Sequence, residues 1–237
     1  MNQIIRGERQ VVVVIPARIG SKRIPRKNLQ EVGGKSLLAI TIETVKKLDS
    51  LARVIVSTDS NEVAGHAIQS GAESPFIRSE NLADDFSGTD AVIQDALNLC
   101  GIPDETLVCC IYPTAVLLTI QSLEKGLQIL KEHLDDLVLA VKPYSHPINR
   151  ALELQVGGEL SYRFPEFVKH RTQDLPLSYY DAGQFYWATA KSWRRLNTGD
   201  AITMRPVILG KFSAFDIDDY EDLEFVRQIF RISAPNE

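Results

Sequence analysis

The chain has little cysteine, and none of it is spaced to bind a metal or to form a redox pair. Among 237 residues there are three cysteines, Cys100, Cys109 and Cys110, and no CxxC motif. Cys109 and Cys110 lie inside the apolar run LVCCIY, which suits a buried strand. The pattern therefore predicts reduced cysteines in the core of a cytoplasmic protein rather than a disulfide scaffold.

Long apolar runs and an excess of positive charge are also missing. No run approaches the roughly 20 apolar residues of a membrane span, and the segment MNQIIRGERQ lacks the apolar core of a signal peptide. The formal net charge of -5 argues against a general attraction to nucleic acid or anionic lipid. We therefore expect a cytoplasmic protein with a small partner, and neither nucleic acid nor a membrane.

Standard phosphate-binding motifs are absent as well. GGKS at 33–36 resembles the end of a Walker A loop, but Leu29 stands where that motif needs glycine, and no GxGxxG follows the first predicted strand. GGKS instead predicts a turn, with Ser36 or a neighbour as the N-cap of the next helix.

Strand-like and helix-like segments alternate along most of the chain. QVVVVIP at 10–16 and TLVCCIY at 106–112 read as strands buried on both faces, whereas 35–48 and 120–134 have helical periodicity. A short strand is also expected in SPFIR at 74–78. The alternation predicts a single domain over 1–237 with an α/β fold, a three-layer α/β/α arrangement around a mainly parallel, Rossmann-like sheet.

The alternation stops between Lys142 and Tyr180. Residues 143–180 are rich in Pro, Tyr, His and Arg, and LELQVGGELSYRF predicts a hairpin with Gly157 and Gly158 as a two-residue turn. Such an insertion reaches away from an α/β core, either to cover a site or to pair with another subunit.

A basic segment, IPARIGSKRIPRKN at 15–28, follows the first predicted strand. Its five cations are Arg18, Lys22, Arg23, Arg26 and Lys27, and it holds no acidic residue. Pro16, Gly20 and Pro25 make it a loop rather than a solvated helix face, and ligands of open α/β sheets bind beyond the carboxyl ends of strands. Because a nucleoside triphosphate carries about four negative charges, we expect this loop to surround a polyphosphate.

The same segment resembles the N-terminal signature of the CMP-sugar synthetases, a family that includes the CMP-sialic acid and CMP-KDO synthetases. Further matches follow in order: IVSTD at 55–59, FIRSENLADDFSGT at 76–89, TAVLL at 114–118, RTQDLP at 171–176 and FDIDDYEDLEFV at 215–226. The resemblance implies a fold of the nucleotide-diphospho-sugar transferase type and a homodimer built through the excursion. It also implies a cytidylyltransferase, a nucleotidyltransferase that moves CMP from CTP to an acidic keto-sugar and releases pyrophosphate.

The acceptor half resembles one branch of this family. DAGQFYW at 181–187 and FIRSENLADDFSGT are most similar to the pseudaminic acid cytidylyltransferases. Sialic acid enzymes tend to have an Asn-Gly-Ala phrase where Asp181 to Gln184 stand here, and Gln-Pro where Tyr112 and Pro113 stand. These departures count against sialic acid as the nine-carbon acceptor, while legionaminic, sialic and KDO-type acids stay as alternatives.

The resemblance also implies roles for the nucleotide half. Arg18 and Lys27 would contact the reacting phosphates, and a larger set would bind the nucleotide. This set comprises Arg18, Ser21, Lys22, Lys27, Asn28, Asp59, Arg78, Ser87 and Thr89. Capping offers a purely structural alternative, with Asp59 and Glu62 as a capping box and Thr89 as an N-cap.

Asp216 and Asp218 are the candidate ligands of Mg²⁺. Their spacing places both carboxylates on one face of a strand, and Mg²⁺ prefers oxygen ligands. The alternative, a capping box of Asp218 and Glu221, explains one aspartate but not the pair. Charge develops on phosphate oxygens in this reaction, so Arg18, Lys27, Asp216 and Asp218 form the predicted catalytic set.

The predicted acceptor-binding residues lie near or within the excursion. They are Tyr112, Lys142, Arg171, Gln173, Asp181 and Gln184. Lys142, Arg150, Arg171 and Gln173 could meet the sugar carboxylate, in their own subunit or in the partner's, and plain surface residues are the alternative. His146 and His170 lack metal-ligand spacing.

Two other classes of protein share parts of this pattern. A non-catalytic nucleotide-binding module would keep the basic loop but has little need for Asp216 and Asp218. A glycosyltransferase with a nucleotide-sugar donor explains the aspartates, but its diphosphate donor calls for fewer cations than the loop supplies.

Overall fold

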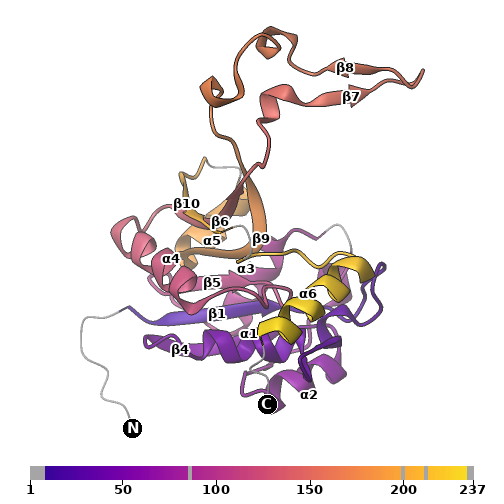
Figure 1. Cartoon of the computed structure of the whole chain (residues 1–237). Helices are drawn as coiled ribbons and strands as arrows, with labels where there is room; N and C mark the ends of the chain where they lie inside the picture. Colours follow the sequence, from indigo (N-terminus) through magenta and orange to yellow (C-terminus); the bar gives the residue numbers. More distant parts are fainter. Residues whose placement is uncertain (1–8, 85–86, 199–200, 211–212, 234–237) are drawn as a thin grey trace.

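A six-stranded sheet forms the centre of the molecule (Figure 1). The computed structural model describes residues 9–84, 87–198, 201–210 and 213–233. In spatial order the strands are β10 (Met204–Ile208), β6 (Leu137–Pro143), β9 (Tyr179–Thr189), β5 (Leu107–Ile111), β1 (Val11–Pro16) and β4 (Leu51–Ser57). β9 runs antiparallel to both neighbours, and the other neighbouring pairs are parallel. The mainly parallel α/β sheet expected from the sequence is confirmed.

Helices cover both faces of this sheet. They are α1 (Leu37–Val45), α2 (Asn61–Gln69), α3 (Thr89–Leu99), α4 (Ile120–Glu132), α5 (Ala190–Arg195) and α6 (Tyr220–Ser233). α1, α2 and α4 contribute to one core, and α3 and α5 to the core on the opposite face. α6 packs with a third cluster that includes Ile24 of the basic loop, Leu37 and Ile217.

The period of two along β1 explains why both faces are covered. Val11, Val13 and Ile15 lie in one core, while Val12 and Val14 lie in the other, and all five are buried. Cys109 and Cys110 are buried in β5 in the same way, and all three cysteines are free thiols. The prediction of strands buried on both faces is confirmed.

Of two local expectations from the sequence, one is wrong and one is confirmed. SPFIR forms no named strand: the neighbouring contact is an isolated bridge between Ile55 and Glu73. Ser36 does cap α1, since its hydroxyl accepts a hydrogen bond from the Ala39 N–H at 3.1 Å. The turn at GGKS separates the two short paired strands β2 (Glu31–Val32) and β3 (Lys35–Ser36).

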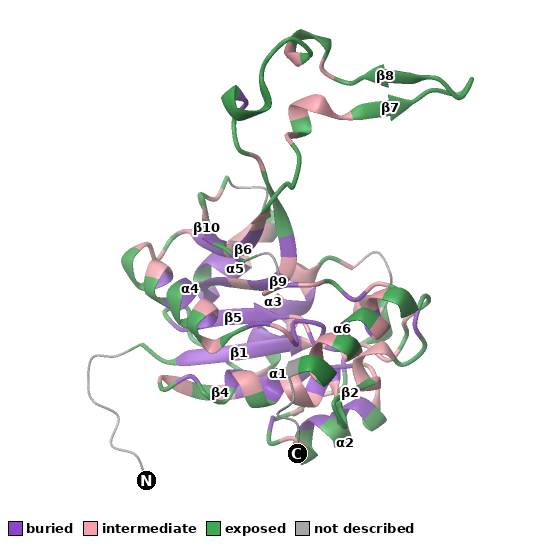
Figure 2. Ribbon diagram, viewed as in Figure 1, coloured by how far each residue is buried: buried purple, intermediate pink, exposed green. Residues whose placement is uncertain are grey.

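Residues 144–178, which we call the arm, project from the sheet between β6 and β9 (Figure 1). Its tip is a hairpin of β7 (Leu152–Leu154) and β8 (Leu160–Tyr162). The predicted two-residue turn is wrong. The Gly158 N–H donates to the Gln155 carbonyl and the Gln155 N–H to the Glu159 carbonyl, so Val156 and Gly157 form the turn and Gly158, with φ 93°, follows it in the left-handed region. Figure 2 shows the arm as largely exposed.

No helix in the described residues is long and apolar enough to cross a bilayer.

Gly126 provides a test of how tightly α4 packs on the sheet. A Cβ at Gly126 would lie 2.7 Å from Trp187 Cδ1 and 3.0 Å from Phe185 Cε2, whereas a Cβ at Gly65 in α2 would meet nothing within 4 Å. We expect Gly126→Ala to lower the free energy of unfolding by about 1–3 kcal/mol, because overpacking outweighs the better helix propensity of alanine. Gly65→Ala should be neutral or stabilising by up to about 1 kcal/mol. Urea unfolding measures both, and equal stability of the two variants would contradict the packing described.

Candidate active site

A cleft of about 860 Å³ opens beyond the carboxyl ends of β1 and β5. Ligands of open α/β sheets bind at this edge. The predicted site residues that line the cleft are Arg18, Ser21, Lys22, Lys27, Asn28, Arg78, Ser87, Thr89, Tyr112, Asp181, Asp216 and Asp218. Segments that lie far apart in the sequence therefore meet in one hollow, with the cations of the basic loop at one side.

Specific backbone contacts hold the basic loop in place after β1. The Ala17 N–H donates to the Ser57 carbonyl at 2.9 Å, and the Ile19 N–H donates to Asp59 Oδ1 at 2.8 Å. Asn28 Nδ2 donates to the Arg18 carbonyl at 2.9 Å, and Ile24 is completely buried. The loop is thus fixed before any ligand arrives, which is the condition for electrostatic stabilisation without reorganisation.

Asp59 anchors this loop and does not cap α2. The N-cap is Ser60, whose hydroxyl accepts from the Val63 N–H at 3.4 Å, so the predicted capping box of Asp59 and Glu62 is wrong. Asp59 is also absent from the lining of the cleft. Its carboxylate acts on the backbone of the loop, through Ile19.

Two arginines of the cleft donate to backbone carbonyls. Arg18 Nη1 donates to the Ala83 and Asp84 carbonyls, at 3.4 and 3.2 Å. Arg78 is 5% exposed, and its Nη2 donates to the Ser57 carbonyl at 2.8 Å. Burial lowers the pKa of the Arg78 guanidinium from its ordinary value. Its buried Nε has no hydrogen-bond partner among the described residues.

Asp216 and Asp218 both line the cleft, although they do not lie on a strand as predicted. Residues 214–218 have no regular secondary structure, yet the alternation holds, because Ile217 is buried between the two aspartates. Lys27 Nζ donates to the Ile217 carbonyl at 2.6 Å and lies 3.7 Å from Asp218 Oδ1. Arg23 Nη2 is 2.6 Å from the same Asp218 oxygen.

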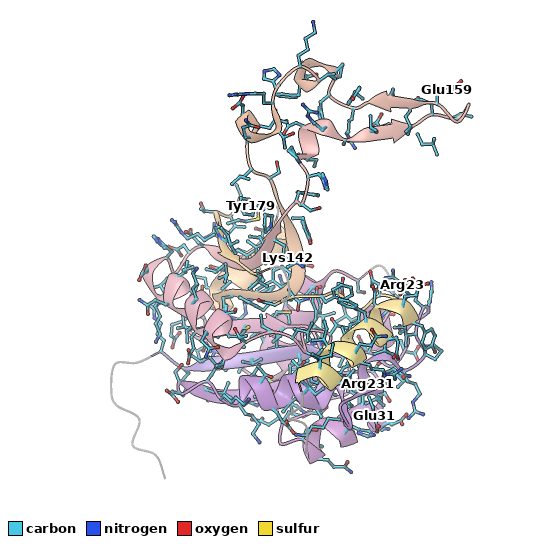
Figure 3. The ribbon with its side chains drawn as sticks, in the orientation of Figure 1. Arg23, Glu31, Lys142, Glu159, Tyr179 and Arg231 are labelled. Carbon is cyan, nitrogen blue, oxygen red and sulfur yellow. The ribbon has the colours of Figure 1, made fainter. Side chains whose placement is uncertain are left out.

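The capping alternative for Asp218 is wrong by one residue. Asp219 caps α6, since its Oδ1 accepts from the N–H groups of Glu221 and Asp222 at 2.9 and 3.0 Å. Asp222 Oδ2 accepts in return from the N–H groups of Asp218 and Asp219. The Asp218 carboxylate is therefore left to the cations of the basic loop (Arg23 is labelled in Figure 3).

The aspartate pair fits a metal that arrives together with phosphate. The described residues contain no cluster of three or more His, Cys, Asp or Glu that could hold an ion. Mg²⁺ is usually bound by one or two carboxylates together with substrate phosphates, so two aspartates are enough. Burial, followed by the charge of nearby Asp218, raises the pKa of Asp216 from its ordinary value.

Two tyrosines, a threonine and Asp181 form one wall of the cleft. Thr89 Oγ1 and the Tyr112 hydroxyl are 2.5 Å apart, and the Tyr186 hydroxyl donates to Asp181 Oδ2 at 2.7 Å. The Tyr112 and Tyr186 rings meet edge to face, with centroids 6.0 Å apart. The capping alternative for Thr89 is wrong. Gly88 is the N-cap of α3, and the Thr89 hydroxyl contacts the Tyr112 hydroxyl instead.

The remaining predicted residues lie outside the lining of the cleft. Lys142 Nζ donates to the Ala214 carbonyl at 2.8 Å, where the arm meets the sheet (Figure 3). Gln184 is completely buried in β9, with its Nε2 on the Ala182 carbonyl. Arg171 and Gln173 are exposed on the arm, and Arg171 pairs with Asp174.

Sequence reasoning missed other residues that line the cleft, including Arg23, Asp84, Gly183 and Tyr186. Arg23 stood in the basic segment without a role. Tyr186 could not be foreseen, because residues five apart face opposite sides of a regular strand. In β9 the register shifts: Tyr186 pairs with Leu139 but Asp181 with Val141, so five steps on β9 oppose two on β6. This bulge brings Tyr186 and Asp181 to the same wall.

The chemistry of the cleft defines the class of the protein. Several cations line the cleft beside two carboxylates that suit a divalent metal, and this arrangement serves the transfer of a phosphorus-centred group from a nucleoside triphosphate. The fold and the cleft are those of a nucleotidyltransferase.

Comparison with known proteins narrows the class to a family. A family model described as Cytidylyltransferase matches residues 12–156. The chain is 34% identical over 223 residues to "Pseudaminic acid cytidylyltransferase" of Campylobacter jejuni, an alignment that covers 93% of this chain and 96% of that protein. The chain belongs to the cytidylyltransferase family.

One further relative matches part of the chain in sequence, and one solved structure matches it in fold. "CMP-N,N'-diacetyllegionaminic acid synthase" of Legionella pneumophila is 43% identical over 88 residues, which is 37% of this chain and 38% of that protein. A solved structure of CMP:2-keto-3-deoxy-manno-octonic acid synthetase complexed with CTP superposes with a TM-score of 0.71 at 16% identity, covering 95% of this chain and all of that one. At that identity the likeness establishes the fold.

Tyr112 gives the wall a pH signature. Burial raises the pKa of its phenol to about 12, against about 10 for a free phenol. The neutral Tyr112 phenol therefore contributes its full stabilisation of the folded chain below pH 10. This contribution is lost as the pH rises to about 12, because the phenol ionises at a lower pH in the unfolded chain. We expect the free energy of unfolding to fall over this range by up to about 2 kcal/mol more in the wild type than in Tyr112→Phe. Urea unfolding at each pH measures this, and identical pH profiles would contradict the burial of the phenol.

Proposed function

We propose that the chain transfers CMP from CTP to the anomeric hydroxyl of a nonulosonic acid, with pseudaminic acid as the acceptor, and releases pyrophosphate. One observation carries the proposal: a single cleft is lined by the basic loop, the pair Asp216 and Asp218, and the wall with Tyr112 and Asp181. The full-length similarity to pseudaminic acid cytidylyltransferases supports this choice of acceptor. The match to a legionaminic acid enzyme over 88 residues keeps that acid as the alternative.

The basic loop would hold the triphosphate. Gly20 and Ser21 offer backbone close to the cleft, and Lys22 adds a charge-assisted donor. Arg18 and Lys27 are the proposed contacts of the reacting phosphates, because both line the cleft and are fixed by carbonyl groups. Negative charge grows on the α-phosphate and the departing pyrophosphate, so cations already in place lower the barrier.

The proposed cytidine end lies beyond β4 and at the start of α3. We assign Arg78, Ser87 and Thr89 to this end, together with Asn28 of the basic loop, because all four line the cleft. Asp59 would act on the nucleotide through the loop that it anchors at Ile19.

Asp216 and Asp218 are the proposed ligands of Mg²⁺. When bound, the ion would neutralise phosphate oxygens and help orient the triphosphate. The lysine and arginine that contact the aspartate segment, Lys27 and Arg23, already place it against the phosphate loop. We also propose a cytoplasmic location, because the reaction consumes CTP and the three cysteines are free.

Asp216 provides a direct test of this mechanism. Asp216→Asn keeps the size of the side chain but removes its charge, and we expect turnover to fall about 100-fold or more, as losses of key transition-state groups do. Asp219→Asn is the matched control: asparagine caps helices as well as aspartate, so α6 and turnover should both persist. The assay measures pyrophosphate with CTP, Mg²⁺ and a panel of pseudaminic, legionaminic, sialic and KDO-type acids.

Each result of that assay has a distinct meaning. Turnover with sialic but not pseudaminic acid would overturn the acceptor. CTP binding without any pyrophosphate release would favour a non-catalytic module. Full activity of Asp216→Asn would remove the metal-ligand assignment.

We further propose that the arm forms a homodimer, and that residues 143–180 complete the acceptor site. Leu152 and Tyr162 oppose each other across the hairpin, as do Leu154 and Leu160, so all four lie on one face. Leu154 is 73% and Leu160 63% exposed. An isolated two-stranded hairpin is marginal in water, and a second copy of the chain would cover this face.

The dimer would also answer an electrostatic need of the acceptor. Asp181 in the wall of the cleft would repel the carboxylate of an acidic sugar, whereas the arm carries exposed cations such as Arg171. We therefore assign Arg171 of the partner subunit and Gln173 of the partner subunit to the acceptor carboxylate. Lys142 would act from the root of the arm.

Size-exclusion chromatography with light scattering tests the dimer. The wild type should have twice the mass of one chain, whereas the double variant Leu154→Asp, Leu160→Asp should be a monomer with lower turnover. Ile68→Asp is the control, because Ile68 is 58% exposed but lies on α2. A wild type that stays monomeric at high concentration would contradict the proposal.

A further inference from the structure

The carboxylate of Asp181 is held at both of its oxygens. Its Oδ2 accepts a hydrogen bond from the Tyr186 hydroxyl at 2.7 Å, and its Oδ1 accepts one from the Gly183 N–H at 2.9 Å. Gly183 has φ 58°, a left-handed conformation that glycine adopts readily. Asp181 is exposed and lines the cleft, yet its orientation is fixed from behind.

Tyr186 is itself held in place by its surroundings. Its ring meets Tyr112 edge to face, and the Tyr112 hydroxyl is paired with Thr89 at the start of α3. Burial and the bond to Asp181 raise the pKa of Tyr186 far above its ordinary value, so the phenol stays a donor at every working pH. The hydroxyl that fixes Asp181 therefore belongs to a rigid network spanning β9, the end of β5 and α3.

An ionised carboxylate in this position favours substituents that donate a hydrogen bond over those that only accept one. It can only accept, and each oxygen keeps a lone pair after the bonds from Tyr186 and Gly183. The carboxylate of an acidic sugar would be repelled here, whereas a substituent with an N–H donor would gain a charge-assisted bond. Nonulosonic acids that carry acylamino substituents, such as the N,N'-diacetyl acid in the name of the Legionella pneumophila relative, present amide N–H groups.

We propose that Tyr186 is a positioning residue for acceptor selection: it holds Asp181 so that the carboxylate accepts a hydrogen bond from the amide N–H of an acylamino group on the sugar. This inference rests on the proposed function and specifies the chemical class of its acceptor. Neither Tyr186 nor Asp181 belongs to the residues that we propose to contact the triphosphate. Removing the phenol hydroxyl therefore changes recognition of the acceptor and leaves recognition of CTP intact.

The test compares Tyr186→Phe and Asp181→Asn with the wild type in steady-state kinetics. We measure KM for the acylamino acid, KM for CTP, kcat, and the inhibition constant of an analogue with hydroxyl groups in place of the acylamino groups. In Tyr186→Phe the KM of the acylamino acid should rise about tenfold, because losing a hydrogen bond to a charged group typically weakens an interaction by that factor or more. The KM for CTP, kcat and the inhibition constant of the analogue should stay within about twofold, within the scatter of such mutational effects.

The control variant and the contrary results complete the design. Tyr220→Phe removes an exposed hydroxyl at the start of α6 and should change nothing. Equal losses for the acylamino acid, its analogue and CTP would show a merely structural role and overturn the inference, as would an unchanged KM. If Tyr186→Phe does not fold, Asp181→Asn, at an exposed position, gives the decisive measurement. A wild type that converts none of the acids would instead refute the proposed function.

Discussion

The anchoring of positive charge in the loop after β1 is the constraint on which the site depends. Five cations in ten residues repel one another unless acceptors surround them. Arg18 meets the carbonyls of Ala83 and Asp84, Arg23 meets Asp218, Arg26 meets Glu62, and Lys27 meets the Ile217 carbonyl. The loop is thus a cluster of cations whose positions are set by the protein before a polyphosphate takes over part of the neutralisation.

The contact of Lys27, like the ion pair between Arg23 and Asp218, reaches far along the chain. It joins the basic loop to a segment 190 residues later in the chain and places Asp218 3.7 Å from the ammonium group. The sequence alone does not assign a function to Arg23 or Arg26. The structure gives Arg26 an ion pair with α2 and gives Arg23 the carboxylate proposed to bind the metal. Two cations of the cluster therefore organise the loop's neighbours as well as the ligand site.

The parts of the molecule that could be predicted are those with a regular period. The alternate burial of Val12 and Val13 follows from a run of apolar residues, and the placement of the basic loop follows from the rule that sites lie beyond strand ends. Capping was predicted poorly. At three helices the N-cap is one residue away from the one expected: the caps are Ser60, Gly88 and Asp219. Several small or polar residues stand at each helix start, and any of them satisfies the capping pattern. The bulge in β9 could not be predicted, because nothing in the sequence marks it. The buried position of Gln184 and the position of Tyr186 at the cleft depend on this bulge and could not be predicted either.

β9 runs from the root of the arm to the start of α5. Its first residue, Tyr179, pairs with Pro143 at the root of the arm, and its last, Thr189, caps α5. Asp181 is two residues from that root, whereas the basic loop follows β1, which β5 separates from β9. A displacement of the arm would therefore be passed to two parts of the cleft: to Asp181 through β9, and to the segment that carries Asp216 and Asp218 through the bond from Lys142 to the Ala214 carbonyl.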